Sequence, residues 1–208
     1  MFKTINEDAS AELVEKKSKF IANIFYVESV EEAEEKIKEV NKKYFDARHN
    51  CYAFSIYTDN GIVSRFSDNG EPSGTAGGPM LNILQGQGLS NCLVIVTRYF
   101  GGILLGTGGL VRAYSDATKL AIENTKIINK DLGIEVSFLV PYSDLQKLQY
   151  YFNKNEIKIL EIKYNENIEV TFEITKEKYQ NILKQKQEMN LNFDILEEMV
   201  LRDKYIEI

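Results

Sequence analysis

The chain has 208 residues, of which 44% are hydrophobic and 27% charged, a composition typical of a soluble globular protein with one large or two modest domains. No apolar run reaches the about 20 residues that span a bilayer, and the first residues lack an apolar signal core, so we expect a cytoplasmic protein without membrane contact. Residues 1–130 carry 15 basic and 16 acidic side chains, a net charge of −1, whereas residues 131–208 carry 10 and 15, a net charge of −5. This balance argues against nonspecific adhesion to DNA or to anionic membranes.

Cysteine and histidine are scarce, which limits metal and redox chemistry. Cys51 and Cys92 each lie in an apolar, strand-like run without metal-ligand spacing, so we expect buried thiols in a reducing compartment. His49 is the single histidine of the chain, which excludes a histidine-rich metal site. We predict neither a metal nor a cofactor.

Alternating apolar residues, turn signals and helical spacing predict the elements of the first part of the chain. One helix is indicated clearly at Ser29, because Glu32 follows three residues later in a capping-box pattern. The run 92–97 is almost entirely apolar, as expected of a central strand buried on both faces. In chain order we predict two strands or one bent strand over 11–27, a helix over 30–44, a strand over 51–57, a tight turn at Asp59-Asn60-Gly61, a strand over 62–66, a helix over 79–85, a strand over 92–97 and a helix over 110–123.

The sequence pattern changes after Gly133, where glycine disappears and the density of charge rises. The following elements are predicted to be a strand over 134–140, a helix over 142–153, strands over 157–164 and 168–174, a helix over 176–189 and a strand over 193–201. The order βαββαβ is that of the ferredoxin-like fold. We therefore expect an α+β protein of two domains, residues 1–132 and 133–208, joined without a long linker.

Glycine and arginine are concentrated in one stretch of the chain. Twelve of the 13 glycines lie between Gly61 and Gly109, and four of the five arginines lie within or beside that stretch. Glycine permits positive φ angles and close approach, and arginine presents a rigid fork of donors that lysine lacks. Specialised contacts are therefore expected here.

The first glycine loop, residues 68–79, precedes a predicted helix. Its glycines would leave backbone N–H groups open to an anion, and Ser73 or Thr75 would cap the helix. Asp68 and Glu71 add two carboxylates to the same loop. Three interpretations remain open: a tight turn with a capped helix, a surface for a ligand or partner, and a catalytic site.

The second glycine loop, residues 101–109, connects a strand to a helix, an arrangement that binds phosphate in many folds. It matches neither the Walker motif nor the dinucleotide fingerprint. Basic and aromatic residues flank it, and such a mixture can also stack RNA bases. These flanking residues are Arg98, Tyr99 and Phe100 on the strand side and Arg112 and Tyr114 on the helix side.

Two structural alternatives compete with these functional interpretations. Arg98 and Arg112 would pair internally with one of three acids and so hold the loops in place; the candidates are Asp68, Glu71 and Asp116. His49 and Cys51 share one face of a strand, a spacing compatible with nucleophilic catalysis. A packed thiol beside a hydrogen-bonded histidine is the alternative, since no orienting acid or oxyanion motif is evident.

Three motifs, over residues 46–53, 67–79 and 96–114, resemble the signatures of the IMPACT family in residue type, order and spacing. The chain as a whole is similar to the bacterial YigZ/YvyE branch of that family. The resemblance implies an N-terminal α/β sandwich like the second domain of a small-subunit ribosomal protein, a fold also found in elongation factor G and GHMP kinases. It implies a C-terminal ferredoxin-like domain resembling those of elongation factor G.

The same resemblance implies a role in the regulation of translation, because eukaryotic members compete for the activator of a stress-responsive kinase. Bacteria lack that kinase pathway, so this partner does not transfer to a bacterial member. The resemblance implies no catalytic residues. We therefore predict a non-enzymatic regulatory protein that contacts RNA, the ribosome or a translation-associated partner through the glycine- and arginine-rich face. The alternatives are an enzyme or sensor for a nucleotide or other anionic, phosphorylated small molecule, and a protein-docking surface. The predicted binding residues are His49, Asp68, Glu71, Ser73, Gly74, Thr75, Arg98, Tyr99, Phe100, Gly101, Gly102, Gly106, Gly108, Gly109, Arg112 and Tyr114.

Overall fold

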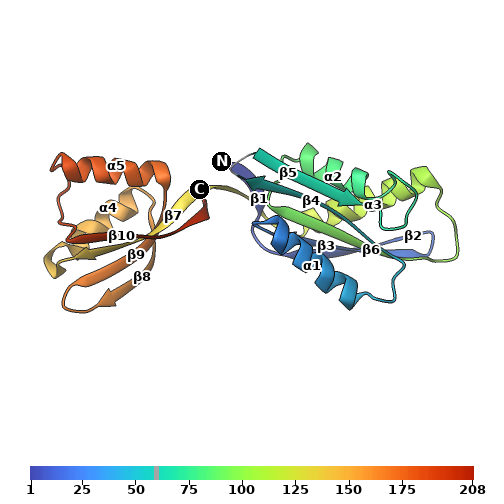
Figure 1. Cartoon of the computed structure of the whole chain (residues 1–208), viewed down its shortest axis with the longest axis horizontal. Coiled ribbons are helices and arrows are strands. Elements are labelled where there is room, and N and C mark those ends of the chain that lie inside the picture. The colour runs from blue at the N-terminus through green and yellow to red at the C-terminus, as the bar shows by residue number, and fades with distance from the viewer. Residues whose placement is uncertain (59–60) are drawn as a thin grey trace. The chain divides into compact units, whose positions relative to one another are not determined.

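The computed structural model describes residues 1–58 and 61–208, so the turn predicted at Asp59-Asn60-Gly61 falls partly outside the described residues. The chain forms two compact units, one of residues Phe2–Asn129 and one of Lys130–Ile208 with Met1 (Figure 1). Their boundary lies inside the long strand β7 (Ile127–Val140). Both units combine helices with an antiparallel sheet, which confirms the α+β fold in two domains.

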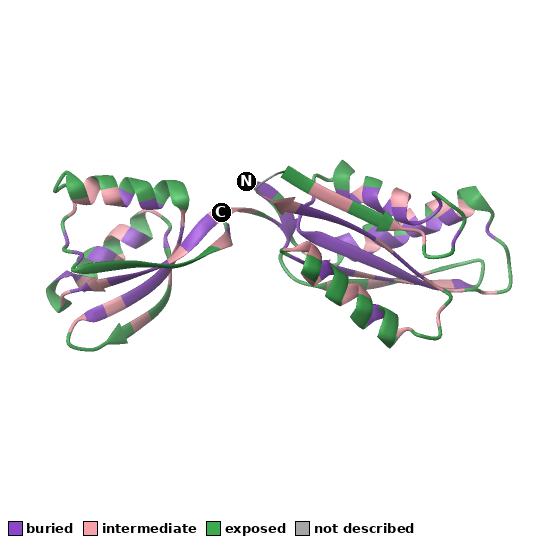
Figure 2. Ribbon diagram, in the orientation of Figure 1, coloured by how far each residue is buried: buried purple, intermediate pink, exposed green. Residues whose placement is uncertain are grey.

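The N-terminal unit is built on a five-stranded sheet in which neighbouring strands run antiparallel. Its order is β2 (Ala9–Glu15), β3 (Ser18–Tyr26), β6 (Cys92–Tyr99), β4 (His49–Thr58) and β5 (Gly61–Ser67). Strand β6 is buried from Cys92 to Arg98, as Figure 2 shows, because helices cover both faces of the sheet at its centre. The predicted central strand is thereby confirmed.

Three helices complete the layers of this unit. Helix α1 (Val30–Lys43) packs on one face, against a core that includes Ile56, Leu93 and Ile95. Helices α2 (Gly77–Gly86) and α3 (Thr107–Glu123) pack on the other face. The Ser29 hydroxyl accepts the Glu32 N–H at 3.1 Å, so the predicted capping residue begins α1.

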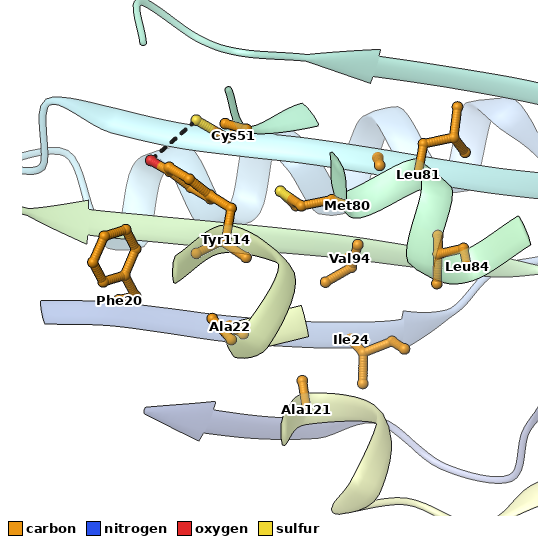
Figure 3. Close-up of a cluster of buried hydrophobic side chains, with 14 of the residues drawn as sticks. Phe20, Ala22, Ile24, Cys51, Met80, Leu81, Leu84, Val94, Tyr114 and Ala121 are labelled. Atoms are coloured by element: carbon orange, nitrogen blue, oxygen red, sulfur yellow. Dashed lines mark hydrogen bonds between the residues drawn. The ribbon is translucent and has the colours of Figure 1, made fainter. Parts of the chain in front are cut away.

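The core between the sheet and helices α2 and α3 is drawn in Figure 3. Side chains from β3 and β6 face side chains from both helices, and each fully buried aliphatic residue contributes about 1.5–3 kcal/mol. The residues that line this core include Phe20, Ala22, Ile24, Val94, Met80, Leu84, Tyr114 and Ala121. This packing holds α2 and α3, and therefore the two glycine loops that precede them, against the same end of the sheet.

The C-terminal unit has the element order βαββαβ, as predicted. After β7 come a short 3-10 turn (Tyr142–Asp144), α4 (Leu145–Lys154), β8 (Lys158–Tyr164), β9 (Ile168–Thr175), α5 (Lys176–Gln187) and β10 (Glu197–Glu207). The strands lie in the order β10, β7, β9, β8, all antiparallel, which is the ferredoxin-like arrangement. Both helices cover one face of this sheet, where Phe138, Phe152 and Phe172 pack with ring centroids 4.5–6.4 Å apart.

The largest differences from the predicted elements are one strand that was not predicted and the bounds of two strands that were. Strand β1 (Phe2–Ile5) pairs with β7 and was not predicted, because four residues carry too little periodicity. Strand β7 begins seven residues earlier than the predicted range. Strand β10 begins at Glu197 rather than at Phe193, because Phe193 and Ile195 enter the core from the preceding segment, whereas the charged residues after Leu201 continue the pairing with β7.

Candidate functional site

The predicted binding residues gather at one end of the N-terminal sheet. Arg98, near the end of β6, lies opposite Phe20 of β3 and His49 of β4. The β2–β3 turn, at Lys16 and Lys17, reaches the same end, and both residues have positive φ angles. Both glycine loops therefore meet the sheet at the same end. The sequence alone did not show whether the two loops lie close together.

The two glycine loops are joined by the Glu71 carboxylate. Its Oε1 accepts hydrogen bonds from Arg98 Nη1 at 2.7 Å and from the Tyr114 hydroxyl at 2.9 Å. The side chains of Arg98 and Glu71 are only 8% and 3% exposed. The internal-pairing alternative therefore holds for Arg98, whose guanidinium is enclosed, and Tyr114 is equally buried.

Arg98 also organises the start of the second loop. Its guanidinium carbon lies 5.5 Å from the Phe20 ring and 5.6 Å from the Phe100 ring, within cation–π range. Arg98 Nη2 is 3.5 Å from Ser18 Oγ, which accepts the Gly101 N–H at 3.1 Å. These contacts fix the backbone from which the exposed part of the loop extends.

The Asp68 carboxylate caps helix α2 although it lies eight residues or more before it in the chain. It accepts hydrogen bonds from two N–H groups at the start of the helix at 2.9–3.0 Å, and from one N–H group within the loop at 2.8 Å. The donors are the N–H groups of Gly74, Ala76 and Gly77. The predicted caps were wrong, since Ser73 makes no capping bond and the Thr75 hydroxyl donates to the Pro72 carbonyl at 2.6 Å. The amides that an anion would need in the first loop are thus occupied by the protein's own carboxylate.

Cys51 and His49 do not form a catalytic pair. The Cys51 thiol donates to the Asp68 carbonyl at 2.9 Å and contacts the Tyr114 hydroxyl at 3.4 Å, as Figure 3 shows for the second contact. Burial raises the pKa of Cys51 to about 12, so the thiol is neutral. His49 Nδ1 instead contacts the Asn69 carbonyl at 2.8 Å, which agrees with the packed-thiol interpretation.

We expect both cysteines to resist alkylation and disulfide exchange in the folded protein. Burial raises the pKa of Cys92 to about 11 as well, so that at about pH 8 the thiolate fraction of each is on the order of a thousandth or less. A colorimetric thiol titration is expected to detect neither in native protein and both in concentrated guanidinium chloride. A native thiol that reacts as fast as free cysteine would contradict the burial of that residue.

Beside the buried Arg98–Glu71 pair lies an exposed surface of mixed cationic and apolar character, hereafter the strand-end surface. Leu104, in the second glycine loop, is 82% exposed. Its four cations make no ion pair or hydrogen bond with any residue in the described ranges. The strand-end surface consists of Lys16, Lys17, Arg48, Phe100, Ile103, Leu104 and Arg112.

A cavity of about 370 Å³ opens at one side of this surface, between β2 and α3. Lys16 and Arg112 line it together with the carboxylates of Glu15 and Asp116. Helix α3 begins here at Thr107, and its N-cap residue Gly106 has a φ of 72° and supplies no side-chain cap. The first turn of α3 is therefore open to an acceptor, in contrast to the capped start of α2.

The structure divides the predicted residues into two groups with different roles. A buried group supports the loops and comprises Glu71, Thr75, Arg98 and Tyr114. Three half-buried residues join it: Asp68, and the glycines Gly101 and Gly109, which lie against Lys17 and Leu105. An outer group is exposed or half-buried and comprises His49, Ser73, Gly74, Tyr99, Phe100, Gly102, Gly106, Gly108 and Arg112. Tyr99 donates its hydroxyl to Asp46 at 2.8 Å.

Sequence reasoning missed several residues of this site. Lys16 and Lys17 occupy the turn between two strands. A predicted hairpin over this segment would have placed both residues in an exposed turn. Ile103 and Leu104 were passed over because apolar residues in a loop are usually buried. Ser18 carries no sequence signal, since its role depends on a loop 83 residues away.

A three-layer α/β unit followed by a ferredoxin-like unit defines a class of two-domain α+β proteins, and known proteins of this class are similar to the chain. The Impact N-terminal domain matches residues 16–122, and a domain of unknown function, DUF1949, matches residues 139–186. IMPACT family member YvyE of Bacillus subtilis is 37% identical over 80% of this chain and 76% of its own length. IMPACT family member YigZ of Escherichia coli is 37% identical over 72% and 74%.

A relative from Haemophilus influenzae, also an IMPACT family member, is 35% identical over 88% of this chain and 90% of its own. A crystal structure of a hypothetical protein aligns with a TM-score of 0.64 and 30% identity over 94% of this chain and 96% of that chain. The chain belongs to the IMPACT family. Within the described residues, no helix is long and apolar enough to cross a membrane, and no group of His, Cys, Asp and Glu is arranged to hold a metal ion.

Proposed function

We propose that this protein is a non-enzymatic, cytoplasmic regulator of translation that contacts the ribosome, at its RNA, through the strand-end surface. The observation that carries the proposal is a set of four exposed cations that make no ion pair within the described residues, at the end of the sheet from which an exposed aromatic and aliphatic loop extends. Membership of the IMPACT family supports the link to translation, which the resemblance to its eukaryotic members implies.

The chemistry of this surface matches RNA better than a neutral partner. Lys16, Lys17, Arg48 and Arg112 are free to neutralise phosphates, and release of counterions would supply affinity in a protein whose net charge is −6. The Phe100 ring is half exposed and lies over Arg98, so it presents a face on which a base can stack. The cations position the RNA and the ring adds contact area.

The buried group beneath this surface supports the proposal through preorganisation. Glu71, Arg98 and Ser18 tie both loops to the sheet through side chains that are themselves buried. A loop held in one conformation loses little entropy on binding, which increases affinity without any new contact. In this proposal Arg98 is a positioning residue and Arg112 contacts the partner.

The second candidate function is recognition of a nucleotide or phosphorylated small molecule. The uncapped start of α3 and the adjacent cavity favour it. The carboxylates of Glu15 and Asp116 in the cavity and the capped start of α2 count against it. A ligand of this kind would raise the unfolding temperature in a thermal-shift screen of nucleotides and phosphorylated metabolites.

Reversing one charge on the strand-end surface is expected to weaken ribosome binding. Cosedimentation with ribosomes and with bare RNA would compare wild type with Lys17→Glu and Arg112→Glu at low and moderate salt. Each variant is expected to bind at least about tenfold more weakly, and its affinity to fall less steeply with salt, because one phosphate contact is lost.

Arg65→Glu is the matched control, because Arg65 is an exposed arginine on β5 outside the strand-end surface. It is expected to bind as wild type does. Equal binding by all three variants, or no ribosome and RNA binding by wild type, would refute the proposed function. A thermal shift with a phosphorylated ligand in that case would favour the second candidate.

A further inference from the structure

The loop that joins α1 to β4 brings a second exposed ring to the end of the sheet that carries the strand-end surface. This ring is that of Phe45, which is 84% exposed. The Tyr99 hydroxyl donates to the Asp46 carboxylate at 2.8 Å and so holds this loop against the end of β6. Phe45 and Phe100 are therefore the chain neighbours of two residues in direct contact, and Figure 1 shows the loops after α1 and after β6 at the same end of the sheet.

The segment around Phe45 carries cations that have no acid partner. Lys42 and Lys43 lie in the last turn of α1 and Arg48 precedes β4; all three are exposed, and none makes an ion pair within the residues that the structure describes. The two acids nearest in the chain are engaged, since Glu39 pairs with a lysine of α1 at 3.0 Å and Asp46 accepts the tyrosine hydroxyl. The mixture of cations and an exposed ring thus continues beyond the strand-end surface, onto an α1 extension that consists of Lys42, Lys43 and Phe45.

We propose that the strand-end surface and the α1 extension together bind unpaired RNA, along a path that runs from Phe100 to Phe45. This inference rests on the proposed function and specifies the form of RNA that is bound. The bases of a single strand are free to stack on the two rings, while its phosphates meet the cations beside each ring. The rings select unpaired bases, and the cations supply attraction that any RNA would feel.

A duplex would leave the exposed apolar side chains of this surface without a partner. In double-stranded RNA the bases stack on one another, and the helix presents phosphates and 2′-hydroxyl groups to a protein. Against Phe45, Phe100 and Leu104 these polar groups would lose hydration without gaining a hydrogen bond. Unpaired bases have apolar faces and lose little in the same position.

The positions of the two rings favour bases over the side chains of an acidic protein partner. Apolar side chains of a protein contribute most when they fill a pocket. The cavity beside Arg112 is lined by Leu13 and Leu105 and not by either phenylalanine. Phe45 and Phe100 are exposed outside that cavity, where a flat ring offers a stacking face.

The experiment measures binding of the full chain to fluorescent RNA by anisotropy at low salt. One unstructured RNA of about 12 nucleotides is used alone and annealed to its complement, so that sequence is constant and only pairing changes. The cations alone would favour the duplex, whose phosphates lie at higher density. The single strand is nevertheless expected to bind at least about tenfold more tightly, because only it can stack on the rings.

Phe45→Ser tests the α1 extension. It is expected to weaken binding of the single strand by about tenfold, because one stacked base is lost, and to change duplex binding by less than about twofold. Tyr150→Ser is the matched control, because Tyr150 is an aromatic residue of α4 that is 68% exposed and lies outside both surfaces. It is expected to bind both forms as wild type does. Circular dichroism verifies that each variant is folded.

The outcomes separate this inference from the proposed function. Equal or tighter binding of the duplex would overturn the inference and leave the proposed function standing. Unchanged single-strand binding by Phe45→Ser, or an equal loss in Tyr150→Ser, would do the same. Cosedimentation with ribosomes without binding of either form of bare RNA would assign the surface to a ribosomal protein and overturn the inference. Absence of both ribosome and RNA binding would refute the proposed function and the inference together.

Discussion

Replacing Arg98 by alanine is expected to destabilise the N-terminal unit by about 3–5 kcal/mol, since removing one partner of a buried ion pair leaves the other charge uncompensated. The Glu71 carboxylate would keep only the Tyr114 hydroxyl as a donor while remaining buried. The Phe20 and Phe100 rings would also lose the cation between them. Hydrogen exchange followed by mass spectrometry of peptides from residues 2–129 reads this unit separately from its neighbour.

Arg65→Ala is the matched control for this prediction. Arg65 pairs with Glu34 at 3.2 Å on the surface, where the two side chains are 56% and 51% exposed. Exposed pairs contribute about 0–1 kcal/mol, so this substitution is expected to have little effect. Arg98→Met combined with Glu71→Gln is expected to recover part of the loss, because no buried charge remains. A similar loss in the Arg98 and Arg65 variants would contradict the buried pair.

Replacing Gly101 by alanine is expected to detach the second glycine loop from the sheet. A Cβ at this position would overlap the backbone of Lys17 and Ser18, and backbone cannot move aside as a flexible side chain can. Overpacking of this kind costs about 1–3 kcal/mol, and the cost is higher where only backbone can yield. Because the loop carries Leu104 and begins directly after Phe100, ribosome binding at the strand-end surface is expected to weaken together with stability.

Gly108→Ala is the matched control for Gly101→Ala, because it replaces another glycine of the same loop without creating a steric overlap. Gly108 lies in the first turn of α3, and a Cβ there would meet nothing within 4 Å. Alanine favours a helix by up to about 1 kcal/mol over glycine, so this variant is expected to be as stable as wild type or more so. The unfolding temperatures of the two variants, each compared with that of wild type, test this prediction. A Gly101→Ala protein with unchanged stability would show that the loop does not rest on the β2–β3 turn.

Some elements were predictable because their signals are local. The capping pair Ser29 and Glu32 specified the start of α1, and the apolar run of β6 indicated a central strand. The element order of the C-terminal unit likewise predicted its fold. Strand β1, which was not predicted, and the wrong bounds of β7 and β10 depend on pairing with distant strands and not on local periodicity.

For the candidate site, sequence alone identified the glycine loops and their flanking arginines, because glycine and arginine are unusual against a lysine-rich chain. Only the tertiary structure decided which residues support the loops and which face a partner. Arg98 and Glu71 are 27 residues apart in the chain, and Ser18 is 83 residues from Gly101, so their contacts exist only once the sheet has formed. Residue type records what a side chain can do, whereas burial and distance, which arise from packing between remote segments, decide what it does.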